Sequence, residues 1–344
     1  MDAYLTMSPD ERRQLCEVAG TALGVRAVSI EKDFWVCWTL RELFALPETG
    51  PHLTFKGGTS LSKCWKLIER FSEDIDVVID RGFLGFGSER SPEATTGSKE
   101  RQRRLEALKV AAQKHIHESL APALERRLRA SLPDESSWTV TNDSDDPDGQ
   151  TLIFAYPSVF PASDYLRPAV KIEMGARSDI EPSATPSVQP YIAEVLPDAL
   201  GVSAFTVQTL DPKRTFWEKS SLLHEETYRA DARPIAARLA RHYYDLWCLI
   251  RAGVGDAALA DLELFSRVVA HRSVFFRRSR EAQDALRPGS LCLLPSTERL
   301  ADWRRDYDAM RETMFIGEPP EFDEILRVVG EFEQRFNRPV ASSS

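Results

Sequence analysis

The sequence predicts an α/β (α+β) protein in which a mixed-sheet lobe over residues 1–210 is followed by a helical lobe over residues 211–344. Short apolar runs bounded by turn residues alternate with helical stretches in the first part, which is typical of strands buried between helices. From Pro212 onward, apolar residues recur at helical spacing with few interruptions. A chain of 344 residues also favours two lobes over a single core.

Helical periodicity opens the first lobe. It extends over residues 9–46 and breaks near Gly24, because glycine is a poor helix former. Within this region we expect a helix over residues 30–44, with Ser29 as its N-cap.

Two short strands should follow, each preceded or followed by turn residues. Residues 53–56 and 75–79 are apolar and bounded by such residues, and a helix from Ser60 to Glu69 is predicted between them. Residues 81–98 are rich in Gly and Ser and predict a loop, and a long charged helix should occupy residues 99–132.

The rest of the first lobe alternates strands with turns. Residues 142–149 are acidic but lack the ligand spacing and closing Glu of a calcium loop, so a hairpin turn is expected there. Strands are predicted at 152–156, 170–174 and 204–210, with a Pro- and Ser-rich loop at 180–189.

Composition describes an ordinary globular protein, with 42% hydrophobic and 28% charged residues. No apolar run approaches the roughly 20 residues that span a bilayer, and the N-terminus lacks a signal-peptide pattern, so we expect no membrane association. The five cysteines are scattered without metal-ligand spacing, which indicates reduced thiols in a cytoplasmic protein.

The net charge of −9 argues against nonspecific coating of nucleic acid but leaves room for a local basic groove. One basic run lies within residues 99–114, where a solvated helix face is the plainer explanation. A second group mixes arginine with aromatic residues, which suits stacking and phosphate contact. It comprises Arg272, Arg277, Arg278 and Arg280 around Phe275 and Phe276.

The segment after the first predicted strand carries the strongest chemical signal. Asp74 and Asp76 are two residues apart on a predicted strand, so their carboxylates should share one face. Adjacent carboxylates repel each other unless a cation lies between them, and their hard oxygens suit Mg²⁺. The alternative is a surface turn followed by an edge strand with solvated acids.

A diglycine turn precedes these acids. Gly57 and Gly58 permit close approach of the backbone to phosphates. Thr59 and Ser60 then open a helix whose unpaired N–H groups attract anions. A phosphate cradle and a metal dyad are together what transfer of a nucleotide from a triphosphate requires.

A Gly-Gly turn before an Asp-x-Asp strand resembles the signature of the DNA polymerase β nucleotidyltransferase superfamily. More closely, Gly57-Gly58-Thr59-x-Leu61-x-Lys63, followed by Arg70-x-Ser72-Glu73-Asp74-Ile75-Asp76, resembles the AbiEii/AbiGii toxin family of bacterial toxin–antitoxin and phage-defence systems. The resemblance implies a polymerase-β-like mixed-sheet lobe with a helical C-terminal lobe. It also implies a Mg²⁺-dependent enzyme that uses NTP as its substrate.

A third carboxylate is expected on a neighbouring strand by analogy with that superfamily. Glu173 is the candidate by position, where it would help to hold the metal or act as general base toward the attacking hydroxyl. An exposed strand glutamate paired with Lys171 or Arg177 is the alternative.

Two residues of the helical lobe complete the candidate site. Lys219 falls among apolar residues, where a lysine is costly to bury unless it meets an anion. Asp245 needs a partner for the same reason, and Lys219 is the candidate. The resemblance implies that Lys219 contacts the triphosphate and that Asp245 is essential, while His242 stands where the family has an aspartate. We expect both residues to share a cleft with Asp74.

The resulting interpretation is a toxin that transfers NMP from NTP, with tRNA 3′ ends as the implied acceptor. Gly58, Ser60 and Lys63 would cradle the phosphates, and Lys219 would neutralise the leaving pyrophosphate. The implied antitoxin is a DNA-binding repressor that has no need to contact the toxin. Modification of protein hydroxyls and an inactive nucleotide-binding module remain alternatives.

Overall fold

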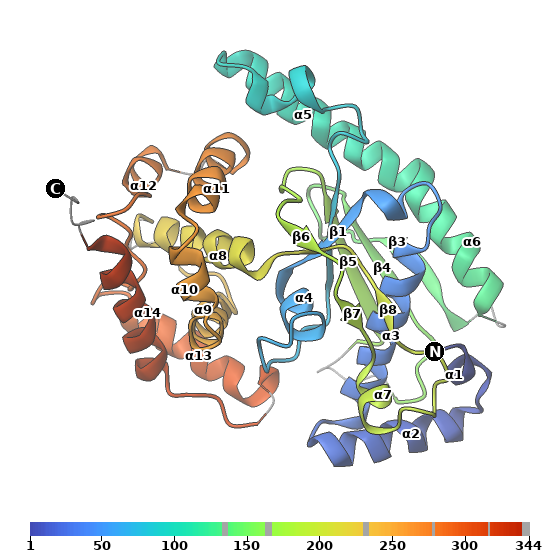
Figure 1. The fold of residues 1–344 in the computed structure, drawn as a ribbon. Coiled ribbons are helices and arrows are strands. Elements are labelled where there is room, and N and C mark those ends of the chain that lie inside the picture. Colours follow the sequence, from blue (N-terminus) through green and yellow to red (C-terminus); the bar gives the residue numbers. More distant parts are fainter. Residues whose placement is uncertain (133–136, 162–166, 230–233, 277–278, 316, 339–344) are drawn as a thin grey trace. The chain divides into compact units, whose positions relative to one another are not determined.

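The computed structural model describes residues 1–344 except 133–136, 162–166, 230–233, 277–278, 316 and 339–344. The chain divides into two compact units (Figure 1). Unit 1 comprises Met1–Cys64 and Ser72–Leu210, and unit 2 comprises Trp65–Phe71 and Asp211–Ser344. The short segment Trp65–Phe71 thus leaves unit 1 in the middle of the motif described above.

Unit 1 is built on a mixed seven-stranded sheet of order β3-β4-β5-β2-β1-β9-β6. β2 runs parallel to β5 and antiparallel to β1, so the sheet is mixed at its centre. The strands of the sheet are β1 (Leu53–Lys56), β2 (Ile75–Ile79), β3 (Thr139–Asn142), β4 (Thr151–Ala155), β5 (Ala169–Gly175), β6 (Ser183–Ala184) and β9 (Thr209–Leu210). A separate antiparallel pair is formed by β7 (Ser187–Val188) and β8 (Phe205–Thr206).

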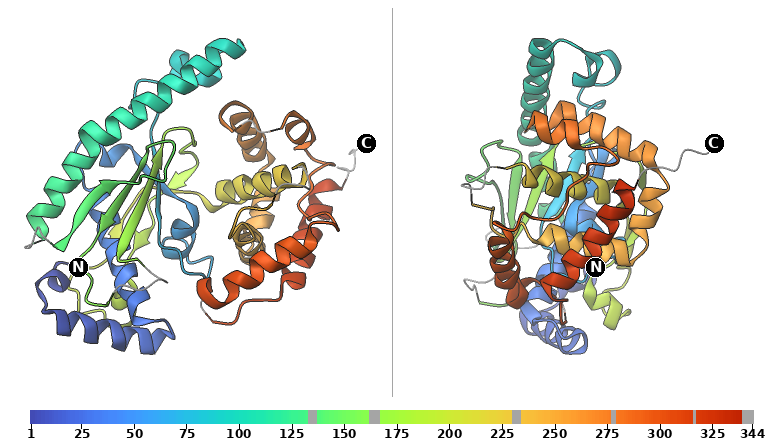
Figure 2. Two further views of the ribbon diagram at one scale, coloured as in Figure 1. Left: turned by 180° about the vertical axis from the view of Figure 1, so that it is seen from behind. Right: turned by 90° about the vertical axis from the view of Figure 1, so that its left-hand side faces the viewer.

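Helices cover one face of this sheet. α3 (Ala27–Phe44) is buried on nearly all sides and contacts both β5 and α6 (Ala121–Ser131), as the two views of Figure 2 allow the reader to follow. Its aromatic side chains join the inward-facing strand residues in one apolar cluster. The remaining helices of unit 1 are α1 (Asp2–Thr6), α2 (Pro9–Leu23), α4 (Gly57–Lys63), α5 (Ser98–His115) and α7 (Tyr191–Val195), with short turns η1 (Gly50–His52), η2 (Ser88–Arg90) and η3 (Pro92–Ala94).

Unit 2 is helical, as predicted from Pro212 onward. An aromatic cluster forms its interior, in which the Trp217 ring lies 4.8 Å from Phe265 and 5.3 Å from Phe336. Its helices are α8 (Pro212–Thr227), α9 (Arg241–Arg251), α10 (Val254–Leu259), α11 (Leu262–Phe275), α12 (Arg280–Ala285), α13 (Leu300–Met314) and α14 (Phe322–Asn337).

The mixed α/β class and the strands near 53–56, 75–79, 152–156 and 170–174 are confirmed. The break near Gly24 is confirmed as well, because Gly24 ends α2 with a left-handed φ of 66°. The hairpin turn at 142–149 joins β3 to β4.

Other boundaries differ from the predictions. Ser29 is buried inside α3, which begins at Ala27, so it is not a cap. The helix predicted from Ser60 to Glu69 ends at Lys63, because the chain then enters unit 2. The strand predicted at 204–210 is two short strands in different sheets.

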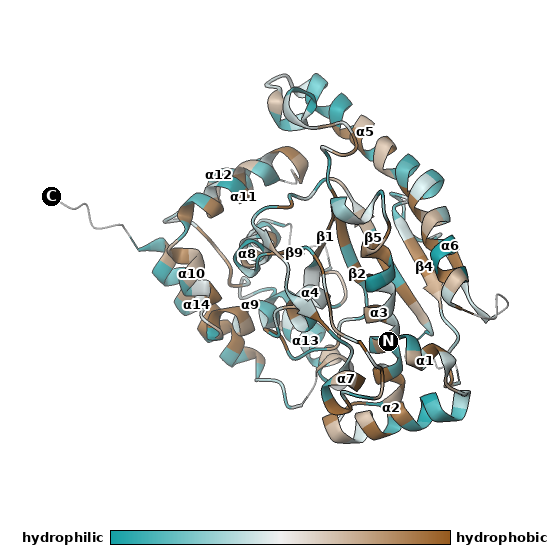
Figure 3. Ribbon diagram, turned by 45° about the vertical axis from the view of Figure 1, so that its right-hand side comes forward, coloured by the Kyte–Doolittle hydropathy of each residue, from teal (hydrophilic) through white to brown (hydrophobic). Residues whose placement is uncertain are grey.

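The long charged helix is present but interrupted. A π-helical turn, η4 (Ile116–Leu120), joins α5 to α6, which carries Pro122 in its first turn. Proline lacks the N–H that a regular helix would use at this point, which accounts for a local irregularity. α5 is largely hydrophilic (Figure 3), and only Leu108 and Ala112 of this helix are buried.

All five cysteines are free thiols, and Cys16, Cys37 and Cys248 are buried. Across the described ranges, no helix combines the length and apolar character needed to cross a bilayer.

Candidate active site

The pairing register of three central strands places the acidic residues on one face of the sheet. Ile75, Val77 and Ile79 of β2 point into the apolar cluster, so Asp76 projects from the opposite face. Asp76 is the direct partner of Glu173 on the parallel strand β5. It is also the partner of Lys56 on β1. Residues far apart in the sequence therefore meet around one carboxylate.

Gly57 makes room for this carboxylate. Its φ is +81°, a conformation that side-chain-bearing residues rarely adopt. A Cβ added to Gly57 would lie 2.1 Å from Oδ2 of Asp76, far inside van der Waals contact. The first glycine of the turn is thus required both by its backbone and by the approach of Asp76.

Asp74 lies just before β2 and is fixed through its backbone. The Thr59 hydroxyl donates to the Asp74 carbonyl at 2.5 Å and lies 2.8 Å from Oγ of Ser72. The Ser60 hydroxyl donates to the Gly57 carbonyl at 2.9 Å. Both hydroxyls therefore stabilise the turn itself, in which Gly57 and Gly58 are half-buried.

Burial and the neighbouring carboxylates raise the pKa values of Asp74 and Asp76. Burial, with a smaller contribution from Glu173, raises the pKa of Asp74 to about 6. Burial also raises the pKa of Asp76 to about 7, against an opposing effect of Lys56, with Glu173 adding to the rise. Asp76 keeps some solvent-accessible surface although protein atoms surround its carboxylate. A cation at this point would relieve the repulsion.

These residues fit Mg²⁺ by their chemistry, since all the available donors are hard carboxylate oxygens. Among the described residues, no three or more His, Cys, Asp and Glu side chains are grouped so that they hold a metal ion by themselves. Proteins often bind Mg²⁺ at nucleotide sites through one or two carboxylates, with substrate phosphates and water completing the shell.

Glu173 has contacts expected both for a third carboxylate beside Asp76 and for a strand glutamate paired with Lys171. Its carboxylate forms an ion pair with Lys171 at 2.8 Å, as the alternative anticipated. It also lies within hydrogen-bonding reach of the Asp76 carboxyl on the neighbouring strand. The structure thus places Glu173 where a third carboxylate would stand, while its role in catalysis stays a prediction.

Lys63 lies in a different environment from the one expected. Its amine is buried, pairs with Asp33 of α3 at 2.6 Å and lies 3.5 Å from the centre of the Tyr191 ring. The backbone N–H of Tyr191 donates to the other Asp33 oxygen at 2.6 Å. Lys63 therefore anchors α4 to α3 and α7, and we propose a supporting role for it in place of direct phosphate contact.

Lys32 is a site residue that the sequence reasoning missed. It is buried on α3, forms an ion pair with Glu73 and lies near enough to Asp74 to oppose the rise in its pKa. The signal was available, because Lys32 interrupts an apolar helix just as Lys219 does.

Unit 2 contains its own buried charge cluster. Asp245 is completely buried, and its Oδ2 lies 2.8 Å from the Lys219 amine, so the partner predicted for Asp245 is confirmed. Burial opposes the charge on Asp245, but Arg70 and then Lys219 lower its pKa strongly. The prediction that this pair shares a cleft with Asp74 joins residues of different units and stays a prediction.

His242 faces this cluster from α9. Its Nδ1 lies 3.3 Å from the Lys219 amine. Burial and the charge of Lys219 lower the pKa of His242 well below its usual value, which favours the neutral ring, and an ammonium at Lys219 can only donate in this contact. His224, by contrast, is a packed residue whose two ring nitrogens bond the backbone of Ala282 and Cys292.

Arg70 was overlooked as a member of this cluster. Its Nε and Nη2 donate to the two oxygens of Asp245 at 2.7 and 2.9 Å. Its position within the Arg-x-Ser-Glu-Asp-Ile-Asp run was a sequence signal, but nothing local in the sequence connects it with a residue on α9.

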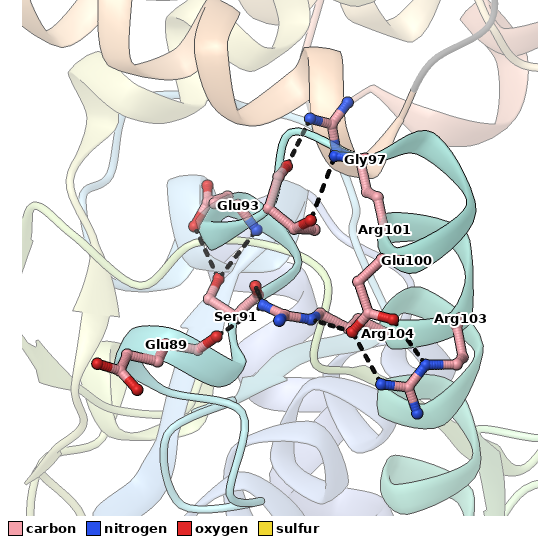
Figure 4. Close-up of polar contacts among 9 residues, drawn as sticks. Glu89, Ser91, Glu93, Gly97, Glu100, Arg101, Arg103 and Arg104 are labelled. Atoms are coloured by element: carbon pink, nitrogen blue, oxygen red, sulfur yellow. Dashed lines mark hydrogen bonds and ion pairs between the residues drawn. The ribbon is translucent and has the colours of Figure 1, made fainter.

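The first basic run is largely engaged within unit 1. Arg104 bonds Glu100 and the carbonyls of Glu89 and Ser91, and Arg101 bonds the Thr95 carbonyl (Figure 4). These contacts attach the loop over residues 81–98 to α5.

Arg103 differs from its neighbours because it is exposed and contacts only Glu100 in the bonds drawn in Figure 4. In the second group, Arg272 pairs with Glu225 and Arg280 with Asp284. Arg277 and Arg278 lie outside the described residues.

The chain is similar to known proteins. A family model described as "Nucleotidyl transferase AbiEii toxin, Type IV TA system" matches residues 38–328. Among solved structures, "MenT4, nucleotidyltransferase toxin Rv2826c from Mycobacterium tuberculosis H37Rv" is similar at 15% identity and a TM-score of 0.33, over 86% of this chain and 99% of that chain. Comparison with curated proteins yields no match. The family match spans most of the sequence and includes both clusters, and the chain belongs to the AbiEii nucleotidyltransferase toxin family of type IV toxin–antitoxin systems.

Proposed function

We propose that this toxin transfers a nucleoside monophosphate from an NTP to the 3′ end of tRNA. The observation that carries the proposal is the meeting of Asp76, Glu173 and the bare backbone of Gly57 at one point of the sheet. Carboxylates provide ligands for a metal ion, and a glycine turn beside them would let the backbone approach phosphates.

Each residue has a definite part in this proposal. Asp74 and Asp76 would hold Mg²⁺, and Glu173 would accept the proton of the attacking hydroxyl. Bound there, Mg²⁺ would supply Lewis-acid stabilisation of charge on the triphosphate. Gly58 leaves the backbone open to the phosphates.

Lys219 would neutralise the departing pyrophosphate, and Asp245 would orient its amine. The Asp74 and Lys219 clusters belong to different units, so the proposal requires that both reach the same triphosphate.

The acceptor and the antitoxin rest on the family alone. The family name supports a cognate antitoxin, and we propose a DNA-binding repressor that acts without obligatory contact with the toxin. For the acceptor, tRNA is preferred over protein hydroxyls.

The test is a transfer assay with purified protein. Each α-labelled NTP is incubated with Mg²⁺ and either total tRNA or a protein lysate. We expect label on the tRNA, with a loss of about a thousandfold in Asp74→Ala and Asp76→Ala variants, which remove metal ligands. Asp198→Ala, which changes an exposed carboxylate in a turn of unit 1, should transfer normally.

The outcomes separate the alternatives. Labelled protein in place of tRNA would support modification of protein hydroxyls. NTP binding without transfer to either acceptor would support the inactive module. Near-normal transfer by both aspartate variants, each folded, would remove Asp74 and Asp76 from the site.

A further inference from the structure

Arg70 reaches Asp245 from a segment that is attached to unit 2 by its backbone. The Phe71 N–H donates to the Met314 carbonyl at 2.6 Å, and Arg70 forms an antiparallel bridge with Phe315. Phe315 packs in turn on Tyr244 of α9, with ring centres 4.5 Å apart. The backbone of Arg70 is therefore held in unit 2 independently of the ion pair that its side chain forms.

Arg70 and Lys219 share a single carboxylate. Arg70 takes both oxygens of Asp245 in a bidentate contact, which is the stronger geometry for such a pair. Lys219 contacts Oδ2 alone, and that oxygen also accepts from Arg70. Asp245 is thus the shared counterion of two buried cations.

The charges do not balance at this point. Arg70 and Lys219 both pair with Asp245, so this cluster carries one positive charge in excess when both cations are protonated. Burial lowers the pKa of Lys219, Asp245 opposes this fall, and Arg70 and Arg241 add to it. His242 is neutral and offers Lys219 only a lone pair. Buried charge without compensation is costly, so such an excess is typical of a site that receives an anion.

We propose that Arg70 sets the charge of the Lys219 site: by occupying Asp245, it leaves the Lys219 amine with positive charge for a phosphate group of the NTP. Without Arg70, Asp245 would neutralise Lys219 as a simple ion pair, and the site would lose its attraction for anions although Lys219 remained. This inference rests on the proposed function, because it takes a triphosphate to be the anion that Lys219 meets.

The proposal distinguishes charge from mere support. Replacing Arg70 by Met removes one cation and brings the cluster to neutrality. Replacing Asp245 by Asn in the same protein removes the anion as well and restores the single positive charge on Lys219. If Arg70 acts through charge, adding Asp245→Asn should restore the affinity for the triphosphate that Arg70→Met lowers. If Arg70 only supports the fold, adding Asp245→Asn should lower that affinity further.

The experiment measures binding of non-hydrolysable analogues of ATP, CTP, GTP and UTP, with Mg²⁺, by calorimetry. We expect Arg70→Met to lower the affinity for the analogue by about tenfold or more, which is the size expected for the loss of one charged interaction. Arg70→Met/Asp245→Asn should return to within about threefold of the unchanged protein, and adding Lys219→Met should abolish the rescue. Salt should weaken binding less steeply in Arg70→Met than in the rescued protein.

Thermal unfolding of each variant controls for folding. Should Arg70→Met unfold, the double variant carries the test alone, because it lacks the Arg70–Asp245 ion pair, keeps the Lys219 amine and is expected to bind within about threefold of the unchanged protein. Binding by the folded double variant at tenfold lower affinity would overturn the inference. If Lys219→Met alone binds as tightly as the unchanged protein, or if no analogue binds at all, the proposed function fails first, and the inference fails with it.

Discussion

Asp76 offers a direct measurement of the repulsion that a metal would relieve. Its pKa rises from the usual 3.8 to about 7 because the carboxyl is desolvated and faces Glu173. A tenfold change in a protonation equilibrium corresponds to about 1.4 kcal/mol, so ionising Asp76 in the metal-free protein costs at most about 4 kcal/mol. Because Asp76 retains some contact with solvent, we expect about 2 kcal/mol.

The sign follows from the direction of the change. Well below pH 4 the Asp76 carboxyl is protonated in both the folded and the unfolded chain, so it does not change the free energy of unfolding. As the pH rises toward 7, the unfolded chain ionises readily while the folded protein resists, so the free energy of unfolding decreases. Asp76→Asn has no charge to desolvate and should escape this decrease.

The assay is thermal unfolding in EDTA between about pH 4 and pH 8. Asp76→Asn should gain about 4–8 °C over the unchanged protein at pH 8, and the gain should vanish toward pH 4. Glu17→Gln, at an exposed position of α2, removes a carboxylate of no special surroundings and should follow the unchanged protein throughout. A gain that is equal at both ends of the pH range would refute the reasoning, because it would not come from ionisation.

Three further predictions concern the surroundings of the site. Gly57→Ala should lower transfer by at least about a hundredfold, since its Cβ would displace the Asp76 carboxylate; activity close to normal would show that Asp76 is free to move. Lys63→Met should lower the free energy of unfolding by about 3–5 kcal/mol in urea titrations by leaving buried Asp33 unpaired, and adding Asp33→Asn should recover part of it. Arg103→Glu should reduce transfer to tRNA and flatten the salt dependence of RNA binding by about one unit while NTP affinity stays constant. Equal RNA binding by Arg103→Glu and by Glu118→Gln, a control on the exposed side of η4, would show that the acceptor docks elsewhere.

Local patterns explain why the first unit could be read from the sequence. The central strands are short apolar runs with turn residues on both sides, and alternation along β2 separates Ile75 and Val77 from Asp76. The diglycine predicts a backbone with positive φ, and Gly57 has such a φ. Such features depend on neighbours in the chain, and sequence alone records those neighbours in full.

Predictions that failed, or residues that were missed, depend on contacts between distant segments. The helix after the diglycine ends early because residues 65–71 pack in unit 2. Lys63 was expected to contact phosphate, but its buried amine pairs with Asp33 of α3 and lies over the ring of Tyr191 of α7. No sequence signal near Arg70 indicated that its side chain pairs with Asp245.

The sequence by itself therefore determined the class of fold, the strand that carries Asp76 and the lysine and aspartate that need buried partners. Tertiary structure alone decided that Glu173 lies beside Asp76, that the Lys63 amine pairs with Asp33 and that Arg70 and Lys219 share the Asp245 carboxylate. The physical reason is that hydrophobic periodicity is a property of neighbouring residues, whereas the charge and accessibility of a buried group are set by whichever side chains the fold brings against it.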